Sequence, residues 1–219
     1  MTFTTAQQTH LAMMQAILNG VREIPLVLKG GTALLLCYGL DRFSEDLDFD
    51  APKKLNLESR IEHALRPATE SLRLTRTKDT ETVQRYRIEY GSGDTAGRLK
   101  VEISCRDEIR EDDVIVRSGI RTYRASRLIS QKLLALEGRT AARDLYDVHF
   151  LARNFREEWS ADSVSRLRSL LSDMNSLENR FRLAFEEDDL FRDRDDLIAG
   201  LILEISELLR TKKELRSQS

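Results

Sequence analysis

Residues 26–49, LVLKGGTALLLCYGLDRFSEDLDF, constrain the fold more than any other stretch of the chain. An apolar run meets Gly30 and Gly31, and a short helical pattern then continues to Gly39. In residues 46–50, acidic and apolar residues alternate with the period of two that is typical of a half-buried strand. The stretch therefore predicts a strand, a tight turn, a helix and a second strand.

The turn Gly30-Gly31-Thr32 has the residue types of a phosphate-binding loop. Glycine lets the backbone approach a ligand closely, and the first N–H groups of the following helix can donate to an anion. The Thr32 hydroxyl is expected either to cap that helix or to donate to a phosphate oxygen. Taken alone, the three residues favour a plain structural turn.

Asp46 and Asp48 change that interpretation. On a strand they share one face, and like charges side by side cost stability unless something neutralises them. One or two carboxylates together with substrate phosphates are how proteins hold Mg²⁺. An isolated pair of this kind is more typical of a solvated edge strand. Because this pair follows a phosphate-type turn and the lead-in Arg42-Phe43-Ser44, we interpret Asp46 and Asp48 as metal ligands.

Two further carboxylates bear on this site. Asp50 precedes Ala51-Pro52 and is expected to cap the strand end instead of binding metal. Glu102 shares one face of a predicted strand, 99–104, with Lys100. If that strand neighbours the aspartate pair, Glu102 completes a three-carboxylate cluster suited to two-metal catalysis, or takes a proton from an acceptor hydroxyl. An exposed surface glutamate is an equal alternative.

A third block lies further along the chain. Lys132 stands in a leucine-rich helical segment, where it is either solvated or supplies a point charge to triphosphate oxygens. Asp144 and Asp147 are three residues apart and share one face of a helix. They are expected to bond a sugar or base, to orient Lys132 or Arg143, or to cap a helix start near Thr140.

The chain of 219 residues can bury a core of one large or two small domains. Its sequence predicts an α/β half, residues 1–120, followed by an all-helical half, residues 121–219. The other expected helices are 5–19, 33–38, 58–72, 126–137, 140–153, 161–172, 176–187 and 195–213, and the other expected strands are 26–28 and 83–90.

The composition of the chain bears on its cellular location and on its possible partners. No apolar stretch reaches the roughly 18 residues of a membrane helix, and the N-terminus lacks a signal-peptide pattern. Cys37 and Cys105 have no Cys or His at metal-ligand spacing, so reduced thiols and a cytoplasmic location are expected. The net charge of −2 gives no general affinity for nucleic acid, although 35 Lys and Arg can form a local basic surface.

These blocks together resemble the AbiEii/AbiGii nucleotidyltransferase toxins of the DNA polymerase β-like superfamily. The resemblance covers residues 26–153 and rests on the motifs KGGTAL, RFSEDLDF and RDLYD together with Lys132. It implies an α+β fold, in which a core of mixed sheet and flanking helices is followed by a C-terminal helical bundle. It also implies that the helical domain contributes Lys132 and Asp144 to the site.

The family pattern implies a role for each matching residue. Asp46 and Asp48 would hold the metal, and Lys132 and Asp144 would complete the catalytic site. To this set the residues alone add Glu102 as a candidate catalytic residue and third metal ligand. The nucleotide would be bound by Gly30, Gly31, Thr32, Arg42, Ser44, Lys132 and Asp147. Many relatives carry a basic residue soon after the glycine turn. Leucines stand there in this chain, so that contact is missing or is supplied by Arg42.

The implied reaction moves a nucleoside monophosphate from an NTP to an acceptor hydroxyl, with Mg²⁺ (or Mn²⁺) as cofactor. Similar toxins modify tRNA, which makes tRNA or another RNA the expected acceptor and a cognate antitoxin the expected partner. The phosphates of the RNA would contact the arginines of the helical half, unless these pair with nearby Glu and Asp: Arg153, Arg156, Arg166, Arg168, Arg180 and Arg182. Alternatives are transfer to a small molecule or protein, or nucleotide binding without catalysis.

Overall fold

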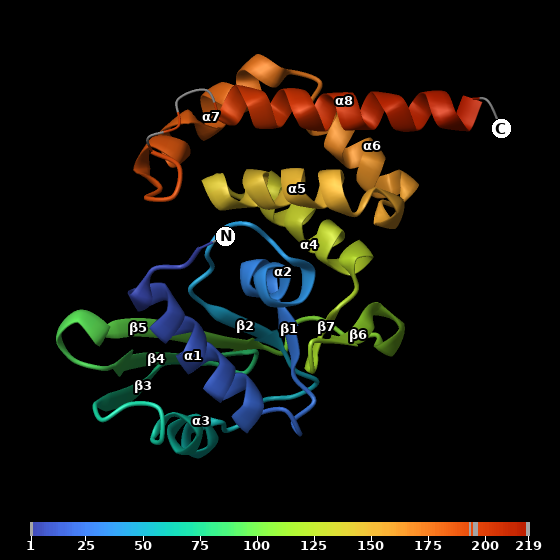
Figure 1. Ribbon diagram of the computed structural model, residues 1–219. Coiled ribbons are helices and arrows are strands. Elements are labelled where there is room, and N and C mark those ends of the chain that lie inside the picture. Colours follow the sequence, from blue (N-terminus) through green and yellow to red (C-terminus); the bar gives the residue numbers. More distant parts are fainter. Residues whose placement is uncertain (1, 193, 195–196, 218–219) are drawn as a thin grey trace. The chain divides into compact units, whose positions relative to one another are not determined.

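The computed structural model describes residues 2–192, 194 and 197–217, and for Asp94 and residues 210–217 it describes the backbone alone. The chain forms two compact units, which divide between Arg124 and Ala125. The first contains the β-sheet and the second is helical, so the expected α+β class is confirmed (Figure 1). The division lies a few residues beyond 120 because β7 (Ile120–Tyr123) pairs with the sheet of the first unit.

The first unit, in its described residues, combines a seven-stranded mixed sheet with α-helices and short 3-10 turns. Its helices are α1 (Thr5–Gly20), α2 (Gly30–Tyr38) and α3 (Glu58–Leu65), and its other strands are β1 (Val27–Lys29), β2 (Leu47–Asp50), β3 (Leu72–Asp79), β4 (Val83–Tyr90), β5 (Gly97–Ser104) and β6 (Val114–Arg117).

The order of the strands brings distant parts of the sequence together. It runs β3-β4-β5-β2-β1-β7-β6, so β2 lies between β1 and β5. β1 pairs with β2 in antiparallel register, which sets Lys29 opposite Asp48. β5 pairs with β2 in parallel register, which sets Glu102 opposite Asp48. Paired residues of neighbouring strands share a face, and the condition on which Glu102 could join the aspartates is therefore met.

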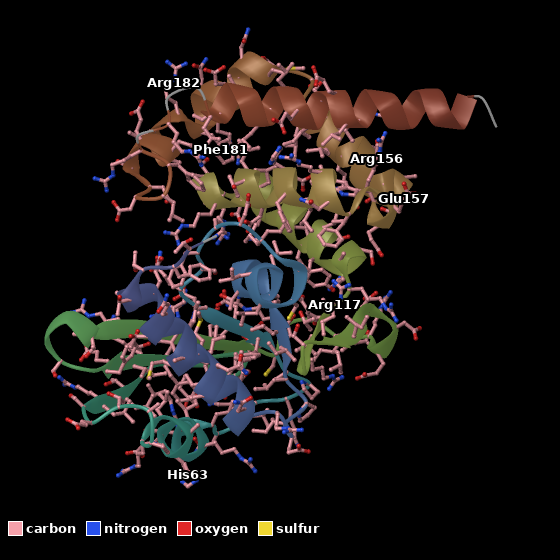
Figure 2. All side chains as sticks on the ribbon, viewed as in Figure 1. His63, Arg117, Arg156, Glu157, Phe181 and Arg182 are labelled. Atoms are coloured by element: carbon pink, nitrogen blue, oxygen red, sulfur yellow. The ribbon has the colours of Figure 1, made fainter. Side chains whose placement is uncertain are left out.

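The opposite face of the sheet is apolar and is covered by α1 and α3 (Figure 1). A capping box at Thr4 and Gln7 starts α1, whose residues Met14 and Ile17 are fully buried. α3 adds Ile61 and Leu65. The helical spacing of these apolar residues places them on one side of each helix, which leaves the charged side of α3, with the exposed His63, toward solvent (Figure 2).

Three strands differ from the sequence-based expectation. The helix predicted over residues 58–72 ends at Leu65, close to Pro67, which has no backbone N–H with which to continue the helical hydrogen bonds. The chain then forms β3, whose side chains alternate between partly and fully exposed positions. β6 and β7 were not predicted. They pair with each other, and β7 also pairs with β1, which is distant in the sequence.

The helical unit contains α4 (Ala125–Gly138), α5 (Ala142–Asn154), α6 (Ala161–Leu170), α7 (Met174–Glu187) and α8 (Leu197–Ser217). Side-chain caps start two of them, since Ser160 accepts from Ser163 N at 3.1 Å and Asp173 accepts from Ser176 N at 2.9 Å. The predicted helix start at 195–196 lies outside the described residues. Within the described residues, no helix is long and apolar enough to cross a membrane.

Candidate active site

The turn between β1 and α2 tolerates only glycine at its two central positions. Gly30 has φ +74°, which L-residues rarely adopt, and a Cβ there would lie 3.3 Å from Asp48 Oδ2. A Cβ on Gly31 would lie 2.8 Å from Arg42 Nη2 and 2.9 Å from Ser44 Oγ. The two glycines thus allow the loop and the strand β2 to approach each other closely.

The N-terminus of α2 faces this turn. Lys29 before it is extended, and no side chain in the described part of the chain caps the helix. The expectation that Thr32 caps α2 is therefore wrong. Its buried hydroxyl lies 2.9 Å from Ser44 Oγ and also bonds the backbone carbonyl of Asp46. The uncapped N–H groups of α2 remain available to an anion.

Two of the three predicted carboxylates form ion pairs with cations. Asp46 Oδ2 lies 2.6 Å from Lys100 Nζ, and Glu102 Oε2 lies 2.6 Å from Arg85 Nη2. Asp48 differs: among the described residues it has neither an ion pair nor a hydrogen bond. Lys100 shared a predicted face with Glu102, and this was the sequence signal for its proximity to the site.

The environment of Asp48 disfavours its charged form. Burial raises the pKa of Asp48, and the charges of Asp46 and Glu102 raise it further, whereas Lys100 and Lys29 oppose the shift. Burial lowers the pKa of Lys100, but its hydrogen bond to Asp46 and the neighbouring carboxylates outweigh that effect and raise it. Asp48 is therefore a partly buried carboxylate that a bound cation would stabilise in its ionised form.

Asp50 has a role other than the expected strand-end cap. It is fully buried, and its Oδ1 lies 2.5 Å from Lys29 Nζ. The Tyr123 hydroxyl donates to Asp50 Oδ2 at 2.9 Å. Asp50 thus links β2 to β1 and β7 by a buried network, which fixes the strand that carries Asp48.

In the helical unit, Lys132 is held between two aspartates. Lys132 Nζ lies 2.9 Å from Asp144 Oδ1 and 2.7 Å from Asp147 Oδ2, and Arg139 Nε donates to Asp144 at 2.7 Å. Lys132 is buried, so it is not the solvated lysine of the alternative interpretation. Burial lowers its pKa, but the two carboxylates outweigh this and raise it, while Lys132 and Arg139 lower the pKa of Asp144 against its burial. Of the expected roles for Asp144 and Asp147, orienting Lys132 is the one seen.

The chain matches a known family over most of its length. Residues 12–210 match the family model described as the nucleotidyl transferase AbiEii toxin of type IV toxin–antitoxin systems. The chain belongs to this family.

Two solved structures from Helicobacter pylori resemble this AbiEii-family chain. The crystal structure of JHP933 is 36% identical, has a TM-score of 0.89, and the match covers 99% of this chain and 96% of that one. A candidate nucleotidyltransferase is 37% identical, has a TM-score of 0.90, and the match covers 99% of both chains. No curated protein matches the chain. The AbiEii-family chain is thus a nucleotidyltransferase by family and a toxin of the type IV class.

The donor set of this AbiEii-family site fits a divalent metal only in part. Within the described residues, no three His, Cys, Asp or Glu side chains form a metal-binding group. Asp46 and Asp48 nevertheless offer hard oxygen ligands on one sheet face, and Mg²⁺ commonly uses one or two carboxylates with substrate phosphates. Burial and the neighbouring carboxylates raise the pKa of Asp48, and a positive charge beside it would favour its ionised form. Glu102, bound by Arg85, is not in a metal-binding arrangement in this structure.

Sequence analysis missed one residue that supports the site. His10 Nε2 lies 2.7 Å from the carbonyl oxygen of Glu45, and His10 Nδ1 lies 2.6 Å from the Tyr90 hydroxyl. Because a carbonyl only accepts, Nε2 carries the proton and donates. His10 thereby fixes the residue that precedes Asp46. No local pattern could reveal this contact, since the three residues are far apart in the sequence.

The arginines of the helical half are largely engaged within that half. Arg166 Nε donates to Glu137 at 3.0 Å, and Arg182 pairs with Glu178 at 3.3 Å. Arg180 donates to the carbonyl of Leu136 at 2.9 Å, and Arg168 donates to that of Leu209 at 3.0 Å. Of these, Arg182 projects from the surface of α7 (Figure 2). Two of the six arginines, Arg166 and Arg182, therefore pair with acidic side chains as the alternative expected, whereas Arg168 and Arg180 bond backbone carbonyls.

Proposed function

We propose that this AbiEii-family nucleotidyltransferase transfers a nucleoside monophosphate from an NTP to a hydroxyl of RNA, tRNA being the first candidate. The observation that carries the proposal is Asp48. Among the described residues this carboxylate has no ion pair or hydrogen bond. It is partly buried beside Asp46, and it faces the glycine turn at the uncapped start of α2. A cation and a phosphate together would satisfy both features.

In the proposed reaction, the acceptor hydroxyl attacks the α-phosphorus of the NTP. The new P–O bond forms as the bond to the bridging α–β oxygen breaks, and pyrophosphate leaves with that electron pair. Glu102 lies opposite Asp48 on β5 and would receive the hydroxyl proton. Asp46 and Asp48 would hold Mg²⁺ or Mn²⁺, which would neutralise charge on the phosphates.

The backbone around Gly30 and Gly31 is proposed to hold the triphosphate. Because the Thr32 hydroxyl already bonds the lead-in to β2, Thr32 would contribute its backbone N–H. Arg42 is buried and lies against Gly31. Its positive charge would therefore stabilise the glycine turn when a phosphate is bound there. Ser44 is proposed to stabilise the turn as well, through its hydrogen bond with Thr32.

The helical unit is proposed to contribute Lys132 to the phosphates. Asp144 and Asp147 would keep its ammonium charged and oriented. Outside the catalytic step, family membership implies a cognate antitoxin, and we propose a cytoplasmic setting for both proteins.

The test uses the purified full chain with Mg²⁺, bulk tRNA and each α-labelled NTP in turn. Label covalently attached to RNA, with stoichiometric pyrophosphate release, is the expected result. Label on a small molecule or on protein would instead favour the alternative acceptors. If no NTP yields pyrophosphate with tRNA present, the proposed transfer is wrong.

A further inference from the structure

One face of the strands β3, β4 and β5 carries an excess of cations. Register places its residues on the same side of the sheet as Glu102 and Asp48, because Arg85 lies opposite Glu102 and Glu102 lies opposite Asp48. We call this surface the basic sheet face and define it by Arg73, Lys78, Arg85, Arg87, Arg98 and Lys100. Only Glu89 and Glu102 oppose these cations on the same strands and face.

Such an excess is unexpected in a chain of net charge −2. It also brings like charges directly opposite each other, since Lys78 faces Arg85 and Arg87 faces Lys100 across neighbouring strands. Directly opposed like charges destabilise a sheet. The arrangement therefore favours an anionic partner, by the same reasoning that associates the aspartates with a cation.

Two arginines of this face have no partner among the described residues. Arg73 and Arg87 are exposed, and within the described residues neither side chain forms an ion pair or hydrogen bond. Arg98 is 82% exposed, and its contact with Glu89 is loose at 3.7 Å. Arg73, Glu89 and Arg98 also line a hollow of about 460 Å³. These side chains differ from Arg166, Arg168 and Arg180 of the helical half, which are bonded within that half.

The basic sheet face is continuous with the proposed catalytic carboxylates. Lys100 belongs to both, through its ion pair with Asp46. Neighbouring strands lie about 4.8 Å apart, so β3 is about 14 Å from β2. The face thus extends from the site to the edge of the sheet, far enough to contact several phosphates of one polymer.

We propose that the basic sheet face binds the phosphate backbone of the acceptor RNA and directs its reacting hydroxyl to Asp46 and Asp48. This proposal rests on the proposed function. It assigns RNA binding to β3–β5 and not to the arginines of the helical half. A small anion would need one enclosed cradle, whereas these cations are spread along three strands and suit a polyanion.

The test compares two double variants of equal charge in the full chain. Arg73→Gln with Arg87→Gln removes the unpartnered cations of the face. Arg60→Gln with Arg110→Gln removes two exposed arginines that lie outside it. Binding of fluorescein-labelled bulk tRNA is measured over a range of salt concentrations, and nucleotide transfer is measured over a range of tRNA concentrations.

We expect the first variant to bind tRNA about tenfold more weakly near 0.15 M salt, because each lost phosphate contact removes about 0.7–0.9 from the slope of log affinity against log salt. Its KM for tRNA should rise while kcat at saturating tRNA stays near the native value. The control variant should match the native chain. Equal losses in both variants, or an unchanged salt slope and KM in the first, would overturn the assignment.

The outcomes distinguish a failure of the basic sheet face from a failure of the proposed nucleotide transfer to RNA. If the native chain transfers label to RNA and the first variant does so with native KM, only the basic sheet face is wrong. If the native chain transfers no label to RNA, the proposed function is wrong, and so is the role of the basic sheet face in it. Unchanged thermal unfolding of both variants excludes misfolding as the cause.

Discussion

Carboxylates meet cations in both units, but the two clusters differ in what they leave unsatisfied. In the helical unit, Lys132 is buried between Asp144 and Asp147, and every one of these charges has a partner within the unit. On the sheet, Lys100 pairs with Asp46, and Asp48 is left without a partner among the described residues. The first arrangement is complete without a ligand, whereas the second is improved by a bound cation.

The pKa directions express the same contrast. Asp144 has a lowered pKa and Asp48 a raised one, although burial acts in the same direction on both. The difference comes from the neighbours, which are Lys132 and Arg139 for Asp144 but include two carboxylates for Asp48. A buried acid therefore indicates a ligand site only when its neighbours fail to neutralise it.

The largest expected effect is the loss of activity on removing the unpartnered charge. Asp48→Asn should lower the transfer rate by about ten-thousandfold, since loss of metal-assisted charge stabilisation costs several kcal/mol at about 1.4 kcal/mol per tenfold. Its thermal midpoint should not fall, because the charge it removes is unfavourable in the metal-free fold. Asp107→Asn, an exposed loop substitution, serves as the control. Native activity in Asp48→Asn would refute the metal assignment.

Lys132→Met tests how much the buried cluster of Lys132, Asp144 and Asp147 contributes to the stability of the fold. It removes the cation that lies between two buried carboxylates, although Asp144 keeps its bond to Arg139, and should lower the free energy of unfolding by about 3–5 kcal/mol. Urea unfolding followed by Trp159 fluorescence measures this, because Trp159 is the single tryptophan and is buried in the helical unit.

The matched control for that change is Lys54→Met. Lys54 pairs with Asp79 at 2.5 Å, but its side chain is 46% exposed, so its loss should cost less than about 1 kcal/mol. Because Lys54 lies in the first unit, circular dichroism monitors its unfolding. Equal costs for the two variants would mean that the Lys132 cluster contributes no more than a surface ion pair.

A smaller effect is expected from Gly30→Ala. Forcing a Cβ into the left-handed region costs about 1–2 kcal/mol. The new Cβ would also lie 3.3 Å from Asp48 Oδ2, so transfer should slow as well. Hydrogen exchange of the amides in β1 and α2 measures the loss. Gly200→Ala in α8, where nothing lies within 4 Å of the added Cβ, should be neutral or stabilising. A neutral Gly30→Ala would show that the turn relaxes easily.

The pH dependence of stability should have opposite signs in the two units. The raised pKa of Asp48 means that this group destabilises the fold increasingly as pH rises from 3.8 through the raised value. In EDTA, the advantage of Asp48→Asn over the native chain should grow across that window. Thermal midpoints by circular dichroism measure it, and an advantage that shrinks with rising pH would contradict the raised pKa.

Asp144 should behave in the reverse sense. Its pKa is lowered, so its stabilising contribution is present above 3.8 and is lost as pH falls through the lowered value. The deficit of Asp144→Asn should therefore be full at neutral pH and shrink in acid. Thermal melts followed by Trp159 fluorescence test this, and a deficit independent of pH would argue against an ionic role for Asp144.

Local patterns account for what could be predicted. The period-two alternation of residues 46–50 predicted a strand that is seen as β2, and apolar spacing predicted the helices of the second half. The strands β3 and β6 were not predicted. Their residues show little alternation in polarity, and their stability comes from pairing with neighbouring strands. The roles of the predicted site residues remain predictions that the variants above test.

The sequence by itself determined the glycine turn, the aspartate strand and membership of a nucleotidyltransferase family, since each depends on residues close together in the chain. Only the tertiary structure decided the partners of those residues. It set Glu102 opposite Asp48, paired Lys100 with Asp46 and gave Asp48 no ion pair or hydrogen bond among the described residues. It also gathered the cations of β3, β4 and β5 on one face. Such contacts depend on strand order and register, which are fixed by packing between segments distant in sequence.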